Sequence, residues 1–225
     1  MMLSEIAFHS RTRGQPSLRA GEVHLWQAEL RPVDSAMRAL LSADEWLRES
    51  KFHFASDAER YVATRALVRQ ILGGYLDEDP ATLRFVKNQY GKPALETDET
   101  LLRFNISHSE GILLLAIAYG REIGVDVEAV RANVHHEMLA EHYFTPEDQW
   151  ALRITPVHQR TRKFFELWTR TEATVKAHGS GLIEPAVRPG SGGLTVRSFE
   201  PAAGFCAAIA VEGDEFDLAC WKWQQ

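Results

Sequence analysis

The chain lacks the features of a secreted or membrane-spanning protein. It has 225 residues and only two cysteines, Cys206 and Cys220, too few for a disulfide framework or a cysteine-rich zinc site. Its longest apolar run, residues 112–119, is much shorter than the ~20 residues that span a bilayer. No apolar segment of suitable length follows the arginines near the start, so we expect no signal peptide. These absences predict a cytoplasmic protein with no membrane partner.

An excess of positive charge is also absent. The 25 Lys and Arg residues are outnumbered by 31 Asp and Glu, and the net charge of −6 argues against a general nucleic-acid-binding protein, although a local basic pocket stays possible. Three catalytic signatures are missing as well. There is no G-x-S-x-G segment, and no Lys-Ser/Thr follows the glycine-rich residues 190–193. His135, His136 and His142 lack the H-E-x-x-H spacing of a zinc protease.

The apolar pattern predicts an α+β protein built from two similar halves. Residues 57–75 and 164–178 have helical spacing, each ends in glycine, and each is followed by predicted strands. A further helical region covers 134–153, where Thr145 and Pro146 resemble a cap and a first helical residue. The predicted strands are 23–28, 83–86, 102–107, 112–118, 123–128, 194–199, 204–211 and 216–221. This faint repeat indicates a flexible leader over 1–21, an N-terminal half over 22–122 and a C-terminal half over 123–225, with a site in the cleft between the halves.

The segment Gly-Val-Asp-Val-Glu at 124–128 carries two carboxylates on one predicted strand. Side chains two residues apart on a strand share a face, so Asp126 and Glu128 lie together while Val125 and Val127 point into the core. The simplest interpretation is a solvent-facing strand with alternating charge. Two neighbouring carboxylates repel each other unless a cation lies between them, and a bound metal is one such cation.

A second charged pair lies about forty residues later, within Trp168-Thr-Arg-Thr-Glu-Ala-Thr-Val-Lys176. Glu172 and Lys176 are one helical turn apart, which is also the usual geometry of a surface ion pair. Phe165, Trp168 and Val175 make much of this helix apolar, and a largely buried helix keeps charged side chains only where they are paired, coordinated or functional. Three acidic oxygen donors and an amine are what a Mg²⁺-dependent enzyme needs to act on a pyrophosphate.

Other polar residues stand at positions where ligands are often held. Lys92 lies in the turn Tyr-Gly-Lys-Pro at 90–93, and the predicted strand ending in Asn-Ile-Ser-His at 105–108 stops just before a glycine turn. Arg60, Arg65 and Arg69 lie along one helix, where they form either a solvated face or an anion clamp.

Together these segments look like the Sfp-type 4′-phosphopantetheinyl transferases, over nearly the whole chain from Trp26 to Trp221. The family signature is a G-[IV]-D-[IVL]-E strand followed by W-x-x-K-E-A-x-x-K, and here it reads as residues 124–128 and 168–176. The family's G-K-P turn and N-I-S-H strand end are also present, at 91–93 and 105–108. Thr171 departs from the pattern, because the family usually has Lys there. The acidic residue of the family's F-F-[ST]-x-x-E segment corresponds to either Glu147 or Asp148.

The resemblance implies transfer of the 4′-phosphopantetheine arm of coenzyme A to a serine of an apo acyl or peptidyl carrier protein, with release of adenosine 3′,5′-bisphosphate. It implies a pseudo-dimeric fold, which we expect to act as a monomer, and Mg²⁺ as the cofactor. The implied metal ligands are Asp126, Glu128 and Glu172. Lys176 would contact the pyrophosphate, and Glu172 or, as second choice, Glu147 would accept the serine proton.

The same resemblance places five residues around coenzyme A. Lys92, Ser107 and His108 would contact its nucleotide end, and Arg60 and Arg65 would lie near its phosphates. Two alternatives stay open at this point. One is a non-catalytic carrier-protein or coenzyme A-binding module of the same family, for which Thr171 is the only indication. The other is an unrelated Mg²⁺-dependent phosphohydrolase, which would explain the carboxylates but not their combination with Lys92 and His108.

Overall fold

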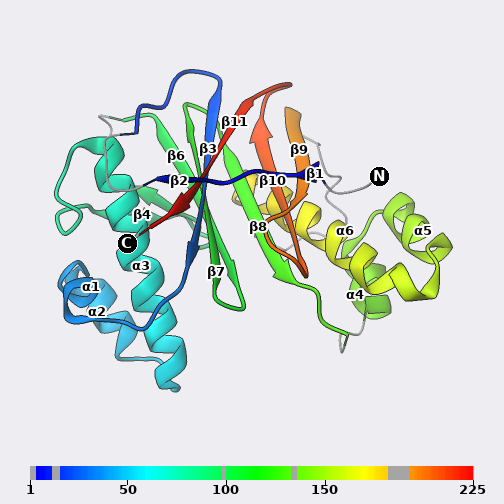
Figure 1. Ribbon diagram of the computed structural model, residues 1–225, viewed down its shortest axis with the longest axis horizontal. Coiled ribbons are helices and arrows are strands. Elements are labelled where there is room, and N and C mark those ends of the chain that lie inside the picture. Colours follow the sequence, from blue (N-terminus) through cyan, green and yellow to red (C-terminus); the bar gives the residue numbers. More distant parts are fainter. Residues whose placement is uncertain (1–3, 12–15, 98–99, 133–135, 182–192, 225) are drawn as a thin grey trace.

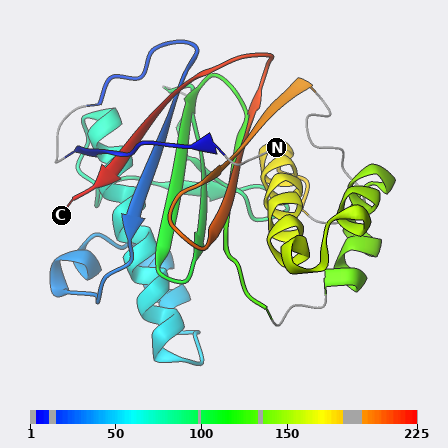
Figure 2. The ribbon, with the colours of Figure 1, turned by 45° about the vertical axis from the view of Figure 1, so that its right-hand side comes forward.

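Two β-sheets, each covered by one long helix, form the body of the protein (Figure 1). The computed structural model describes residues 4–11, 16–97, 100–132, 136–181 and 193–224. The larger sheet has the strand order β2-β11-β3-β7-β6, the smaller one has β1-β9-β10-β8, and β4 and β5 form a separate pair. Helix α3 covers the larger sheet and α6 the smaller, with α1 and α2 beside α3 and with α4 and α5 beside α6 (Figures 1 and 2). The predicted α+β architecture of two similar halves is confirmed.

The described helices are α1 (Ser35–Ala39), α2 (Ala43–Glu49), α3 (Ala55–Leu76), α4 (His136–Tyr143), α5 (Pro146–Ile154) and α6 (Val157–His178). The described strands are β1 (Ser4–Glu5), β2 (His9–Arg11), β3 (Glu22–Glu29), β4 (Phe85–Lys87), β5 (Pro93–Leu95), β6 (Leu102–Ser109), β7 (Ile112–Tyr119), β8 (Ile123–Ala129), β9 (Leu194–Glu200), β10 (Phe205–Glu212) and β11 (Asp217–Trp223). Within the described ranges, no helix is both long and apolar enough to cross a membrane.

Period-two alternation along the strands builds the core. In β7, Leu114 and Ala116 face a cluster shared by both sheets, whereas Leu113 and Leu115 face α3. Strand β8 follows the same rule, because Val125 and its apolar neighbours two residues away enter the shared cluster. The other face of β8 is therefore turned toward α6, and this is the face that carries the two acidic side chains.

Both ends of the described chain cross between the halves. Strand β1 pairs in parallel with β9 of the smaller sheet, and β11 pairs in parallel with β3 and β2 of the larger one. Part of the segment predicted as a flexible leader over 1–21 thus forms strands, because β9 and β11 offer it free edges. The predicted division into 22–122 and 123–225 also does not follow sheet membership, since residues 217–223 complete the sheet of the first half.

Three helix boundaries differ from the sequence prediction. Helix α3 continues through Gly73-Gly74 to Leu76, and Asp77 ends it in the left-handed conformation (φ 56°). Gly73 serves packing instead, because a Cβ there would lie 2.9 Å from the carbonyl oxygen of Glu78. The region 134–153 forms two helices, because Thr145 caps α5 through a bond from Asp148 N–H (3.1 Å). Helix α6 begins at Val157, before the predicted start at 164.

Candidate active site

Gly124 brings β8 unusually close to α6. An ideal Cβ at this position would lie 2.0 Å from the carbonyl oxygen of Ala173 and 2.4 Å from the amide nitrogen of Ala177. Only glycine fits such a contact. The close approach places the acidic face of β8 against the turn of α6 that carries Glu172 and Lys176, which explains why this strand segment begins with glycine.

Strand β8 meets β6 through side chains rather than through backbone pairing. The two strands lie at the ends of their respective sheets. Along this edge, alternate backbone N–H groups of β8 donate to alternate polar side chains of β6, which we name the polar seam: Val125 to Asn105 Oδ1 (2.9 Å), Val127 to Ser107 Oγ (3.3 Å) and Ala129 to Ser109 Oγ (3.1 Å). The seam satisfies the open edge of β8 and joins the two halves where the acidic residues lie.

Asp126 is the buried centre of the site. Its side chain is only 5% exposed, and its Oδ1 accepts hydrogen bonds from Lys176 Nζ (2.6 Å) and Ser107 Oγ (2.8 Å). Lys176 Nζ also donates to Ser107 Oγ (3.2 Å), so one amine, one hydroxyl and one carboxylate form a closed triangle. The solvent-facing interpretation of Asp126 is wrong, and Lys176 pairs across the interface with Asp126 rather than along its own helix with Glu172.

Negative charge accumulates beside this triangle. Burial raises the pKa of Glu172 to about 7, assisted by the charges of Asp126 and Glu128, while Lys176 opposes the shift. The pKa of Glu128 is also raised, first by burial and then by Asp126, against the hydrogen bond from Ser109. These shifts show that the three carboxylates lie within electrostatic reach of one another and that Lys176 alone does not balance them.

The donor set fits the chemistry of the Mg²⁺ ion that the resemblance implies. Carboxylate oxygens are the protein ligands that Mg²⁺ prefers, and Asp126 Oδ2 is buried with no hydrogen-bond partner among the described residues. A cation would also relieve the repulsion among the three acids. In the part of the chain that the structure describes, however, no group of three His, Cys, Asp or Glu side chains is arranged as a metal site. The metal therefore stays a prediction.

Two predicted coenzyme A contacts lie near the triangle. The pKa of His108 is lowered by partial desolvation and by the positive charges of Arg60 and Lys176, although the residue is exposed at the surface. Arg60, at the start of α3, is half-exposed, lies 3.7 Å from Asp57 Oδ1 and lines a cavity of about 370 Å³. Arg60 and Lys176 thus place two positive charges near the imidazole of His108, whose lowered pKa keeps it neutral, and this arrangement beside the buried acids suits an anionic ligand.

Two other predicted contacts have different partners. Lys92 Nζ donates to the carbonyl oxygen of Ala177 (2.9 Å) and to Glu122 Oε2 (2.6 Å), so this lysine caps the last turn of α6. Arg65 bonds to the buried Glu45, and its guanidinium lies 4.4 Å from the centre of the Phe85 ring. The structure does not bring either cation to Asp126, because each is already paired within the scaffold.

The remaining predicted positions lie on α5 and α6. Glu147 is exposed in the first turn of α5, and its role in proton transfer stays a prediction. Thr171, which replaces the family's usual Lys, is 3% exposed and donates to the carbonyl oxygen of Leu167 (3.1 Å). His135 and most of the glycine-rich residues 189–193 lie outside the described residues.

The sequence marks the segment that contains Asn105 and Ser109 as unusual but assigns no role to these two residues. The signal was present, because polar residues at 105, 107 and 109 alternate with apolar ones at 104 and 106. Such alternation normally indicates a solvent-facing strand. Only the position of β8 beside β6 reveals that these side chains take the place of backbone hydrogen bonds between the two strands.

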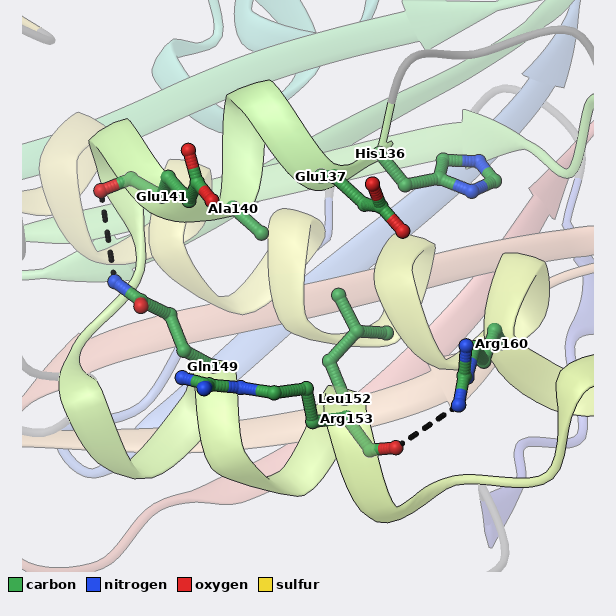
Figure 3. A pocket seen from close by; sticks show the side chains of 8 residues that line it. All are labelled: His136, Glu137, Ala140, Glu141, Gln149, Leu152, Arg153 and Arg160. Atoms are coloured by element: carbon green, nitrogen blue, oxygen red, sulfur yellow. Dashed lines mark hydrogen bonds between the residues drawn. The ribbon is translucent and has the colours of Figure 1, made fainter.

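A second cavity, of about 290 Å³, lies between α4, α5 and the start of α6 (Figure 3). It is lined by the buried Ala140 and Leu152 and by charged residues of both signs, including Glu137, Arg153 and Arg160. Arg160 is already engaged, since its guanidinium donates to the carbonyl oxygens of Thr155 (2.9 Å) and Arg153 (3.1 Å). None of the residues predicted from the sequence as site residues lines this cavity.

Comparisons with known proteins decide the family. The model of the 4′-phosphopantetheinyl transferase superfamily matches residues 122–217, and that of the N-terminal region of 4′-phosphopantetheinyl transferases matches 24–119. The 4′-phosphopantetheinyl transferase HetI of Nostoc sp. is 34% identical over 224 residues, which cover 92% of this chain and 94% of HetI. The chain belongs to the 4′-phosphopantetheinyl transferase family. This phosphopantetheinyl transferase is therefore an enzyme that catalyses a group transfer.

More distant members align over part of this transferase. A 4′-phosphopantetheinyl transferase of Bacillus subtilis is 29% identical over 152 residues, which cover 68% of this chain and 66% of the relative. The 4′-phosphopantetheinyl transferase Sfp of Bacillus subtilis strain 168 is 30% identical over 135 residues, which cover 60% of this chain and 58% of Sfp. The resemblance to Sfp-type transferases predicted from the motifs is thus confirmed.

Proposed function

We propose that the enzyme transfers the 4′-phosphopantetheine group of coenzyme A to a serine of an apo acyl or peptidyl carrier protein and releases adenosine 3′,5′-bisphosphate. The observation that carries this proposal is the triangle of Asp126, Ser107 and Lys176 at the polar seam. It combines a buried carboxylate with a cation that is 28% exposed, and both this cation and Arg60 lie within electrostatic reach of His108. A pyrophosphate ligand needs both a cation at its reacting phosphorus and a positive surface for its remaining phosphates.

The proposed reaction balances without an oxidant or reductant. The serine oxygen of the carrier forms a bond to the phosphorus next to pantetheine, and the P–O bond to the adenosine bisphosphate breaks. The serine proton passes to a carboxylate, for which Glu172 is the first choice and Glu147 the second. Burial raises the pKa of Glu172 to about 7 in the metal-free protein, and a bound divalent cation would lower it and keep Glu172 in the carboxylate form that accepts a proton.

In this proposal Asp126, Glu128 and Glu172 would hold Mg²⁺, which when bound would neutralise charge on the pyrophosphate. Lys176 would contact the leaving phosphate as its negative charge increases. His108 and Arg60 would bind the part of coenzyme A that does not react. We expect no nucleic-acid or membrane partner, and the carriers of fatty-acid, polyketide and nonribosomal-peptide synthesis are all candidate acceptors.

The direct test is to incubate the enzyme with coenzyme A, Mg²⁺ and a small panel of apo carrier proteins and to weigh each carrier by mass spectrometry. A carrier that gains the mass of the phosphopantetheine group supports the proposal. Asp126→Ala should nearly abolish this gain while the circular dichroism spectrum stays unchanged, because one fewer carboxylate leaves Mg²⁺ with too few protein oxygens. Hydrolysis of coenzyme A without modification of any carrier would instead indicate a phosphohydrolase.

A further inference from the structure

The polar seam contains one structural unit twice. Ser107 Oγ accepts a hydrogen bond from the N–H of Val127 and donates one to the carboxylate of Asp126, the residue before it. Ser109 Oγ repeats the pattern two residues later: it accepts from the N–H of Ala129 and donates to Glu128 Oε2 (3.0 Å). In both units a single hydroxyl of β6 bonds both to the backbone of β8 and to one oxygen of a carboxylate on β8. It thus fixes the distance between the two strands and orients the carboxylate.

The second unit fixes Glu128 in a definite orientation. Its Oε2 accepts a hydrogen bond from Ser109 and another from Arg131, whose Nη2 lies 3.3 Å away. Within the described residues, Oε1 has no hydrogen-bond donor. Two donors on one oxygen therefore turn the carboxylate so that the other oxygen stays available, as Asp126 Oδ2 is in the first unit.

Ser109 is the more decisive of the two donors to Glu128. Arg131 is 54% exposed and also lies 3.8 Å from Glu110 Oε1, so its side chain is shared and solvated. The Ser109 hydroxyl makes two hydrogen bonds to strand β8, accepting one from the N–H of Ala129 and donating one to Glu128. Both bonds are part-buried, and a hydrogen bond is stronger there than in water.

We propose that Ser109 is a positioning residue for the transfer reaction, acting through Glu128 on the binding of the divalent cation. The inference rests on the proposed function, since Glu128 is one of the three proposed metal ligands. Partners that orient metal ligands typically change metal affinity or activity by about ten- to a hundredfold when removed. Ser109 would thus link two properties, the docking of the two halves and the affinity of the cation site.

The test compares Ser109→Thr with Ser109→Val. The two variants have nearly the same shape and both suit a strand, but only Thr keeps a hydroxyl. Mg²⁺ is titrated calorimetrically into each protein saturated with coenzyme A, and kcat and the KM for coenzyme A are measured separately. We expect Ser109→Val to weaken Mg²⁺ binding about ten- to a hundredfold and Ser109→Thr to stay within about threefold of the wild type. The KM for coenzyme A should change little in either variant.

A second arm separates positioning from general loosening of the seam. If Ser109 acts through Glu128, Ser109→Val should have little additional effect on Mg²⁺ affinity in a Glu128→Gln background. An equal loss in both backgrounds overturns the proposal, as does wild-type Mg²⁺ affinity in Ser109→Val with only a lower melting temperature. Absence of Mg²⁺ binding by the wild-type protein overturns it whatever the carrier assay gives. The proposed function fails on a different result, namely the absence of phosphopantetheine transfer by the wild type.

Discussion

At the scale of single residues, Lys176 has two roles that can be separated by experiment. It neutralises the buried Asp126, and it presents a cation where the pyrophosphate is proposed to lie. Lys176→Met should therefore lower the free energy of unfolding by about 1–3 kcal/mol, because a buried carboxylate loses its charged hydrogen-bond partner. It should also lower kcat by roughly a hundredfold or more, the scale of a single electrostatic stabiliser.

Urea unfolding and carrier-modification kinetics measure the two effects on the same preparation. Lys176→Arg is the matched control, since it keeps the charge and should recover most of the stability. Thr171 makes the kinetic result clear, because the family's neighbouring lysine is absent and the residue in its place is buried. Wild-type turnover in Lys176→Met would remove Lys176 from the reaction.

Glu172 gives the site a distinctive pH dependence. Its pKa is about 7 in the folded protein against about 4.5 in the unfolded chain, so the folded state holds a proton that the unfolded state releases between these values. Its contribution to stability is full below about pH 4.5 and is lost as the pH rises through about 7. Without divalent cations, Glu172→Gln should thus be more stable than the wild type at pH 8, by on the order of 3 kcal/mol, and by less than about 1 kcal/mol at pH 5.

Denaturant unfolding in a chelating buffer at both pH values measures this difference. Glu215→Gln, at an exposed position, is the control and should run parallel to the wild type. Added Mg²⁺ should stabilise the wild type more than Glu172→Gln at pH 8, because only the wild type has the third carboxylate. Parallel pH curves for Glu172→Gln and the wild type would contradict the burial of this charge.

Residue types and spacing predicted which side chains come together, but not how they pair. The sequence places Asp126 and Glu128 on one face and Glu172 one turn before Lys176, and the fold retains both relations. Spacing along one helix favoured a Glu172–Lys176 pair, and only the packing of α6 on β8 directs Lys176 to Asp126. Lys92 is a second case in which the sequence does not reveal the partner. A lysine in a turn suggests a free cation, but in the fold its amine bonds to the last turn of α6.

At the scale of elements, the contact between β8 and α6 depends on Gly124. Any Cβ there would meet backbone atoms of α6, with Ala173 O at 2.0 Å, and backbone cannot move aside as a side chain can. Gly124→Ala should separate the two elements, break the bond between Lys176 and Asp126, and cost about 3 kcal/mol or more of stability. Transfer activity should fall with it.

Gly204→Ala is the matched control for that change. Gly204 has a positive φ of 83°, but an ideal Cβ there would meet no atom of the described residues within 4 Å, so its replacement adds backbone strain without a clash. We expect a cost of about 1–2 kcal/mol and retained activity. Thermal melts followed by circular dichroism, with carrier modification as the activity assay, distinguish the two variants. Equal melting temperatures would show that the β8–α6 distance is not critical.

At the scale of the whole molecule, β11 belongs to the C-terminal part of the chain but completes the larger sheet, which is otherwise formed by the N-terminal half. Its residues pair with β3 over Asp217–Lys222, and Trp221 packs near Trp26 with ring centres 6.3 Å apart. Ending the chain after Gly213 should therefore destabilise the larger sheet and abolish cooperative unfolding. Ending it after Trp223 should leave the melting temperature unchanged. A cooperative melt in the shorter chain would show that the larger sheet is stable without its C-terminal strand.

Sequence patterns predicted the two-half architecture because helix and strand periodicities repeat locally in each half. They did not predict that β1 and β11 cross between the halves. Strand β1 is too short to carry periodicity of its own. Strand β11 was predicted as a strand, but the partners of both strands lie on sheet edges formed by residues some two hundred positions away. Long-range pairing of this kind is visible only in the assembled structure.

The position of β11 also determines the order in which the protein can be completed during synthesis. Strand β3 emerges from the ribosome long before its parallel neighbour β11, so this edge of β3 stays uncovered until residues 217–223 have been translated. Contacts between such distant segments form slowly, and an open strand edge is a place where nascent chains associate. The first half of this enzyme thus reaches its final form only after the second half has been translated, which makes the nascent chain dependent on protection of that edge until its last strand arrives.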